Sequence, residues 1–93
     1  MRFPSAALTT LLAAASLATT VSVSHAQTCQ DLWVERNQYY KEAGYCFHTP
    51  RAIKYFGNAG CRYDDEAVVP LPRGVRKLIA EISRTERNLG CPR

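Results

Sequence analysis

The chain has 93 residues, four of them cysteines, and a formal net charge of +4. The part after a predicted N-terminal leader, residues 27–93, is short enough to form a single domain whose core alone supplies no more than about 3–5 kcal/mol. Basic and acidic residues are mixed along it, apart from the acidic run Asp64–Glu66. This mixture excludes the continuous basic surface that is typical of nucleic-acid binding.

The first 26 residues have the three parts of a secretory signal peptide: basic Arg2, a mostly apolar middle, and small residues at Ser24 and Ala26. We expect cleavage after Ala26, which leaves residues 27–93 with 11 basic and 8 acidic side chains and a net charge of +3. An uncleaved anchor is the alternative, but serines and threonines interrupt the apolar stretch. Lipidation at Cys29 is another, and Gln27 and Thr28 fit it poorly. We therefore predict a periplasmic or secreted protein with no stable membrane span.

All four cysteines follow the predicted cleavage point, which is typical of an oxidising compartment and a disulfide-stabilised domain. A zinc site is disfavoured because there is no C-x-x-C pair and His48 is the only histidine after residue 26. The missing C-x-x-C also removes the usual redox-catalysis motif. We expect two structural disulfides, no metal and no cofactor.

Residues 30–43 are predicted as a first helix because apolar and aromatic residues recur every three or four positions. Thr28 and Asp31 have the spacing of a capping box. Gly44 suits the left-handed position that ends a helix.

A second, short helix is predicted to begin at Thr49-Pro50, with threonine as N-cap and proline at the first helical position. Ala52, Ile53 and Phe56 would form its inner face, and Gly57 would end it. The following stretch to Pro72 is irregular. In it, Val68–Leu71 is predicted as an extended strap over the core, because prolines push the preceding residues out of the α region.

A third helix is predicted from Pro72 or Arg73 to Leu89, and Gly90 suits its C-terminal stop. Its apolar residues form one stripe, as expected for a helix that packs on a core: Val75, Leu78, Ile79, Ile82 and Leu89. The whole chain is thus predicted to be mainly α-helical, a disulfide-stabilised domain of three helices with an extended strap before the last one.

The helix arrangement predicts the disulfide pairing. Cys29 lies at the start of the first helix and Cys91 just past the end of the third, so the two meet if these helices are antiparallel. Cys46 and Cys61 bracket the second helix. We therefore expect Cys29–Cys91 and Cys46–Cys61 bridges, worth about 4 and 3 kcal/mol by the loop-entropy relation.

Residues 32–47 resemble the core of the YARHG domain, with Leu32-Trp33, Arg36-Asn37, the segment Tyr40-Lys41-Glu42-Ala43-Gly44 and aromatic residues around Cys46. Arg51–Phe56 is similar to the second helical segment of that family. Only the first and last residues of the five-residue signature match, so nothing is carried over from its central alanine, arginine and histidine. The resemblance covers about Cys29–Cys91 and implies a bacterial, extracellular domain with an undefined role; the four cysteines mark a variant of it.

Five residues are candidates for binding: Trp33, Arg36, Asn37, Tyr39 and Tyr55. Arg36 and Asn37 could present a guanidinium fork and an amide to a carboxylate or a sugar. Alternatively, Arg36 pairs with Asp31, Glu35 or the run Asp64–Glu66, and Asn37 bonds a loop carbonyl. Tyr39 and Tyr55 are expected to be exposed, because their neighbours Tyr40 and Phe56 take the inner faces.

No catalytic constellation is found. His48 lacks a neighbouring nucleophile, and the acidic run lacks the spacing of a calcium loop. We therefore expect a non-enzymatic binding or accessory module that acts on cell-envelope polymer or on another exported protein. The alternative is an inhibitor of a secreted enzyme, such as a lysozyme or a protease, that acts through the loop Asn58–Glu66.

Overall fold

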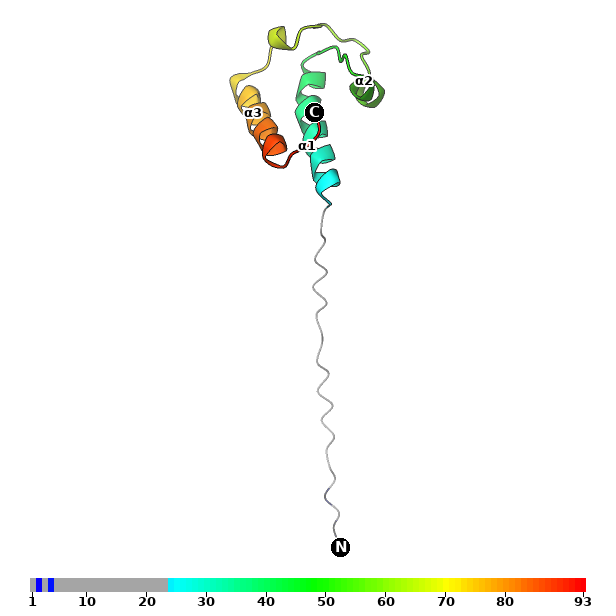
Figure 1. Cartoon of the computed structure of the whole chain (residues 1–93), viewed down its shortest axis with the longest axis vertical. Helices are drawn as coiled ribbons and strands as arrows, with labels where there is room; N and C mark the ends of the chain where they lie inside the picture. Colours follow the sequence, from blue (N-terminus) through cyan, green and yellow to red (C-terminus); the bar gives the residue numbers. More distant parts are fainter. Residues whose placement is uncertain (1, 3, 5–23) are drawn as a thin grey trace.

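A computed structural model of the chain describes Arg2, Pro4 and residues 24–93; the predicted signal peptide lies largely outside these residues. The described part contains helices α1 (His25–Glu42), α2 (Pro50–Phe56) and α3 (Arg73–Asn88), and a 3₁₀ turn, η1 (Glu66–Val68) (Figure 1). Within this part there is no strand, only an isolated parallel bridge between Tyr45 and Tyr63. The mainly α-helical prediction is confirmed. None of the helices described is both long and apolar enough to cross a membrane.

Helix α1 begins five residues earlier than predicted. Its N-cap is Ser24, whose hydroxyl accepts a 3.1 Å hydrogen bond from the Gln27 amide. The predicted capping box at Thr28 is wrong, because Thr28 lies inside the helix and its hydroxyl donates to the Ser24 carbonyl at 3.2 Å. No helix-breaking residue separates Ser24 from Thr28, so the earlier cap extends the helix by more than one turn. At the other end, Gly44 has a φ of 92°, as its predicted stop position requires.

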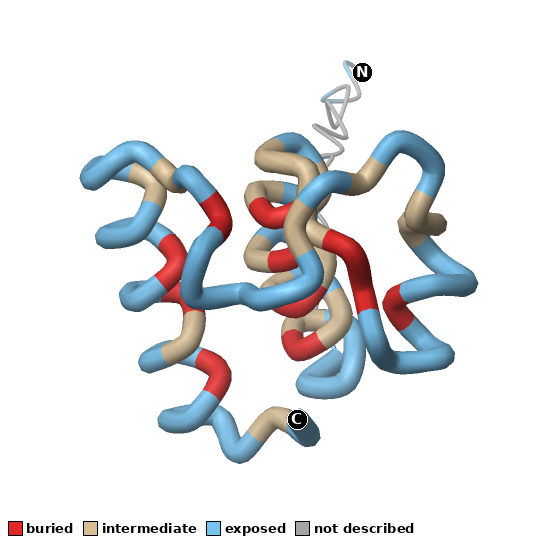
Figure 2. Tube along the Cα trace, turned by 90° about the horizontal axis from the view of Figure 1, so that it is seen from above, coloured by how far each residue is buried: buried red, intermediate tan, exposed pale blue. Residues whose placement is uncertain are grey.

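Helix α1 is the central element of the domain, and α2 and α3 each pack against it without contacting each other (Figure 2). A disulfide joins Cys29, in the first turns of α1, to Cys91, just past the end of α3, so these two helices are antiparallel. The core lies where the three helices and the strap meet, and it is formed by Trp33, Tyr40, Phe47, Ala52, Val69 and Ile79.

The second disulfide joins Cys46 to Cys61 across α2, so both bridges are the pairs expected from the helix arrangement. The loop it closes is also held by Asn58, whose side chain accepts from the Phe47 amide at 2.7 Å and donates to the Phe47 carbonyl at 2.9 Å. With every described cysteine in a disulfide, the protein is suited to an oxidising, extracytoplasmic compartment.

The strap before α3 is real but shorter than predicted. Val69 is extended and only 1% exposed, the most deeply buried side chain described, whereas Val68 belongs to the turn η1 and points into solvent. The Arg76 guanidinium fastens the strap to α3 by donating to the carbonyls of Leu71 and Val69 at 3.0 and 3.3 Å. The strap therefore covers the core mainly with Val69, and the partly buried Leu71 packs beside it.

The predicted inner faces of α2 and α3 are too wide. Ile53 and Leu78 are 42% and 43% exposed, and Leu89 is also exposed. Each of these helices packs on α1 alone, so only a narrow stripe is covered on each. On α3 this stripe contains Ile79, Ile82 and, unexpectedly, the carboxylate residue Glu86.

Candidate functional site

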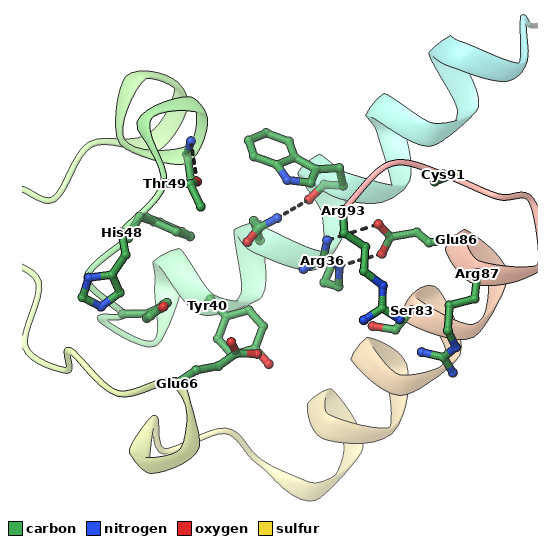
Figure 3. A pocket seen from close by; sticks show the side chains of 15 residues that line it. Arg36, Tyr40, His48, Thr49, Glu66, Ser83, Glu86, Arg87, Cys91 and Arg93 are labelled. Carbon is green, nitrogen blue, oxygen red and sulfur yellow. Dashed lines mark hydrogen bonds and ion pairs between the residues drawn. The ribbon is translucent and has the colours of Figure 1, made fainter.

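A cleft of about 400 Å³ opens beside α1, where α2 and α3 do not meet (Figure 3). Its floor is one face of α1, its first wall is the segment after α1 with the start of α2, and its second wall is the C-terminal half of α3. The residues that line it are Trp33, Arg36, Asn37, Tyr40, Tyr45, Phe47, His48, Thr49, Ala52, Glu66, Ser83, Glu86, Arg87, Cys91 and Arg93.

The four floor residues are Trp33, Arg36, Asn37 and Tyr40. Their spacing of three and four residues places them on one face of a helix. Three of them were predicted as binding residues, and the structure brings these three together in the cleft.

Arg36 forms the one ion pair of the described chain, with Glu86 of α3. Its Nε and Nη2 atoms donate to the two carboxylate oxygens at 2.6 and 3.1 Å, and Glu86 is buried. The predicted partners are wrong: Asp31 and Glu35 border another groove, and Glu66 of the acidic run lines the cleft without forming an ion pair with Arg36. Because Glu86 lies four residues after Ile82 on the inner stripe of α3, the antiparallel register places it opposite Arg36.

Asn37 is also buried, and its Nδ2 donates to the Trp33 carbonyl one turn earlier at 2.9 Å. The predicted bond to a loop carbonyl is therefore wrong, because the amide finds a carbonyl in its own helix. Oδ1 has no hydrogen-bond partner among the described residues, and no fully enclosed polar atom is left unsatisfied there. Asn37 thus offers the cleft a hydrogen-bond acceptor.

Trp33 connects α1 to α2. The Arg51 guanidinium carbon lies 3.8 Å from the centre of the indole ring, and the rings of Tyr55 and Phe56 pack against it with centroids 5.6 Å away. Arg51 also donates to Gln30 of α1. These contacts cover most of the indole, so Trp33 fixes α2 in place as one edge of the cleft.

The other two predicted binding residues lie elsewhere. Tyr39 and Tyr55 border a second, more open groove of about 480 Å³ on another face of α1. Tyr55 is exposed as predicted, while Tyr39 is half-buried. Carboxylate and amide side chains complete this groove together with Val34: Gln30, Asp31, Glu35, Gln38 and Glu42. The five predicted residues therefore belong to two different surfaces.

Two tyrosines in the cleft are kept neutral. Burial raises the pKa of Tyr40 to about 12, and the carboxylate of Glu66 beside it adds to the shift. Burial also raises the pKa of Tyr45, again with help from Glu66 and the two preceding aspartates. Both phenols therefore ionise only at a higher pH than an ordinary tyrosine does.

The cleft has two chemically different ends. Figure 3 shows Arg36, Ser83, Glu86, Arg87 and Arg93 gathered at one end, and His48 and Thr49 at the other. The α3 residues were missed from the sequence, although they continue the spacing of its inner stripe. At the opposite end, His48 Nε2 lies 2.6 Å from the Asp64 carbonyl, so this nitrogen acts as a donor to the loop. No group of three metal-ligating side chains occurs among the described residues.

The first and last residues of the signature at 40–44 have structural roles. Tyr40 is buried in the core, and Gly44 accepts hydrogen bonds on its carbonyl from the amides of Arg62 and Tyr63, at 2.7 and 3.1 Å. A Cβ on Gly44 would lie 3.5 Å from the Tyr63 ring, in ordinary contact, so the positive φ is what favours glycine here. Lys41, inside the signature, donates to the Gly57 carbonyl at 3.1 Å, at the end of α2.

Comparison with known families assigns the chain. The model of the YARHG domain matches residues 7–87, a range that begins within the predicted signal peptide and includes all three helices nearly to the end of α3. No curated protein and no solved structure matches the chain. The matched range covers most of the sequence and contains the signature residues whose structural roles are described above. The chain therefore belongs to the YARHG domain family.

Proposed function

We propose that this YARHG domain protein is exported to the periplasm or secreted, and that it is a non-catalytic binding module. In this proposal its cleft receives a segment of cell-envelope polymer or of another exported protein. Export is supported by the predicted signal peptide at residues 1–26 and by the two disulfides. N-terminal analysis of the protein recovered from the periplasm or the medium would give Gln27 if cleavage occurs after Ala26.

The observation that carries the binding proposal is the composition of the cleft. Guanidinium, amide, hydroxyl and aromatic groups from three separate chain segments line one space of about 400 Å³. A few polar groups within partly apolar walls are typical of ligand sites, and this volume lies within their usual range. The two disulfides hold the walls in place, so a ligand loses little of its binding energy to ordering the protein.

A non-catalytic role is supported by the way in which the reactive side chains are used. The described cysteines are all in disulfides, and His48 donates its Nε2 proton to the Asp64 carbonyl at the end of the cleft away from Ser83. Ser83, the serine of the cleft, follows His48 by 35 residues along the chain and lies on the opposite wall (Figure 3). These groups do not form a nucleophile–base pair.

A cleft-filling substitution tests the proposal. We expect the wild-type protein to be retained on insoluble peptidoglycan, and Ser83→Trp to lose that retention because the indole occupies the cleft. Ala80→Trp is the matched control, since Ala80 is exposed on the same helix and does not line the cleft. Equal retention of both variants would contradict binding in the cleft. No retention of the wild-type protein would contradict the polymer version.

The inhibitor alternative has one observation in its favour, the fastening of the loop Asn58–Glu66. Besides Cys61 and the side-chain bonds of Asn58, the amide of Cys46 donates to the Tyr63 carbonyl at 2.8 Å. A rigid exposed loop of this kind suits the blocking of an enzyme site. Lysozyme and protease rates measured with an excess of the protein test it, and unchanged rates would refute it.

A further inference from the structure

The charged groups of the cleft do not balance at its α3 end. Three arginines line that end, and Glu86 is the only carboxylate side chain among the lining residues there, because Glu66 lies beside Tyr40 at the other side of the cleft (Figure 3). The Glu86 carboxylate is already bound by Arg36 through both oxygens. Arg87 and Arg93 have no ion-pair partner in the described part of the chain. An anionic group of a ligand would therefore be attracted to this end.

The Arg36–Glu86 pair makes this end rigid as well as charged. The pair uses Nε and Nη2 of Arg36, so the plane of the guanidinium is fixed, and Nη1 has no hydrogen-bond partner among the described residues. A guanidinium held in this way presents its remaining N–H groups in one direction, which suits the planar, two-oxygen geometry of a carboxylate. The buried pair thus positions a donor for a third group.

The rest of the cleft suits the groups next to the terminal carboxylate of a peptide, an amide N–H and an apolar side chain. Asn37 follows Arg36 on the floor, and its unpartnered Oδ1 can accept from an amide N–H. Phe47 and Ala52, both buried at 4% exposure, supply an apolar wall for a side chain. A phosphate would match these features less well, since it has no N–H to donate and no apolar part next to its charge.

From these three features we infer that the ligand of the cleft is a peptide segment that ends in a free carboxylate. The carboxylate binds to Arg87, Arg93 and Nη1 of Arg36, the last amide N–H donates to Asn37, and the small side chain of the preceding residue packs on Phe47. This inference rests on the proposed function and specifies its ligand. Peptide stems of the envelope polymer and the C-termini of exported proteins both carry this chemistry.

The single tryptophan of the chain provides the assay, because Trp33 lines the cleft. The disulfide-bonded protein is titrated with N-acetyl-alanyl-alanine as the free acid and as the C-terminal amide, and Trp33 fluorescence is followed. We expect the acid to bind at least about tenfold more tightly than the amide, the effect of one charge-assisted contact. Titrating the D,D and L,L forms of the acid separately distinguishes envelope peptide stems from protein C-termini, since the stems end in D-alanine and proteins end in L residues.

Conservative variants locate the anion. Arg87→Gln and Arg93→Gln are each expected to lower the affinity for the free acid by about three- to tenfold and to leave the affinity for the amide unchanged. Arg84→Gln removes an equal charge from an exposed position of α3 outside the cleft, and it should change neither. An equal loss in Arg84→Gln would show a general charge effect and overturn the inference.

The outcomes also separate this inference from the proposed function. If acid and amide bind equally and Ser83→Trp abolishes both, the cleft binds ligands but the carboxylate is not recognised, and only the inference fails. The same holds if inorganic phosphate competes as well as the free acid does. If neither peptide binds while the protein is still retained on peptidoglycan through the cleft, the ligand is not a peptide terminus, and only the inference fails. Loss of every interaction would overturn both.

Discussion

Separating Arg36 from Glu86 is the sharpest test of how the domain is held together. We propose Arg36→Met, which keeps a long apolar stem, and Glu86→Gln, which keeps the shape of the carboxylate. In the wild-type protein the two groups are joined by hydrogen bonds of 2.6 and 3.1 Å, and their side chains are only 23% and 10% exposed. Each variant leaves the remaining charged side chain without a counter-charge in a largely buried position.

The expected magnitude follows from that burial. Breaking a fully buried pair by removing one partner costs about 3–5 kcal/mol. The Arg36 side chain retains some contact with water through the cleft, so we expect a loss of about 2–4 kcal/mol from the free energy of unfolding. Arg36→Met should be the more damaging change, because the orphaned Glu86 is the less exposed member. In so small a domain each kcal/mol lowers Tm by about 4–8 °C.

Urea unfolding followed by Trp33 fluorescence and by circular dichroism measures the effect, and the double variant completes a thermodynamic cycle. We expect the double variant to be more stable than the sum of the single losses predicts, since no unpaired charge remains. Glu81→Gln, at an exposed position of α3, is the control and should stay within about 0.5 kcal/mol. Single losses as small as that of the control would refute the view that the pair is buried and structural.

Three further predictions concern stability. Because the folded state raises the pKa of Tyr40 to about 12, stability should be intact below pH 10 and fall by about 2–3 kcal/mol towards pH 12; Tyr40→Phe, which lacks this group, should show a smaller alkaline fall, and Tyr45, whose pKa burial also raises, accounts for part of what remains. Gly44→Ala should destabilise by about 1–2 kcal/mol because of its φ of 92°, whereas Gly74→Ala, in the open first turn of α3, should stabilise by up to about 1 kcal/mol in the same urea assay. Replacing Cys46 and Cys61 by serine should cost about 3 kcal/mol, and a loss near zero would mean that the Asn58 hydrogen bonds alone close the loop.

The helix ends that depend only on neighbouring residues could be predicted from the sequence. The start of α2 at Thr49 and the stops at Gly44 and Gly57 depend on neighbouring residues only, and the structure has them where predicted. The first cap was not predicted because Ser24 falls within the predicted signal peptide, before the cleavage point after Ala26. At the start of α1, residues 24–26 have both the small residues of a signal-peptide cleavage site and the N-cap of a helix.

Features that depend on two helices together were harder to predict. Glu86 was not recognised, because a charged residue near a helix end is usually solvent-exposed, and only the register of α3 against α1 places it next to Arg36. Ile53 and Leu78 were predicted to be buried because periodicity shows which side of a helix is apolar. It does not show how much of that side the neighbouring helix covers. The cleft has the same origin, since no pattern in the sequence states that α2 and α3 stay apart.

The Cys29–Cys91 bridge gives the domain an unusual mechanical property. It joins two residues 62 positions apart, near the two ends of the described fold, whose Cα atoms lie 5.5 Å from each other. Tension applied through the flanking residues would run across this covalent bond and bypass α1, α2 and the strap. The cleft would therefore keep its shape under a pull that would unravel the reduced chain.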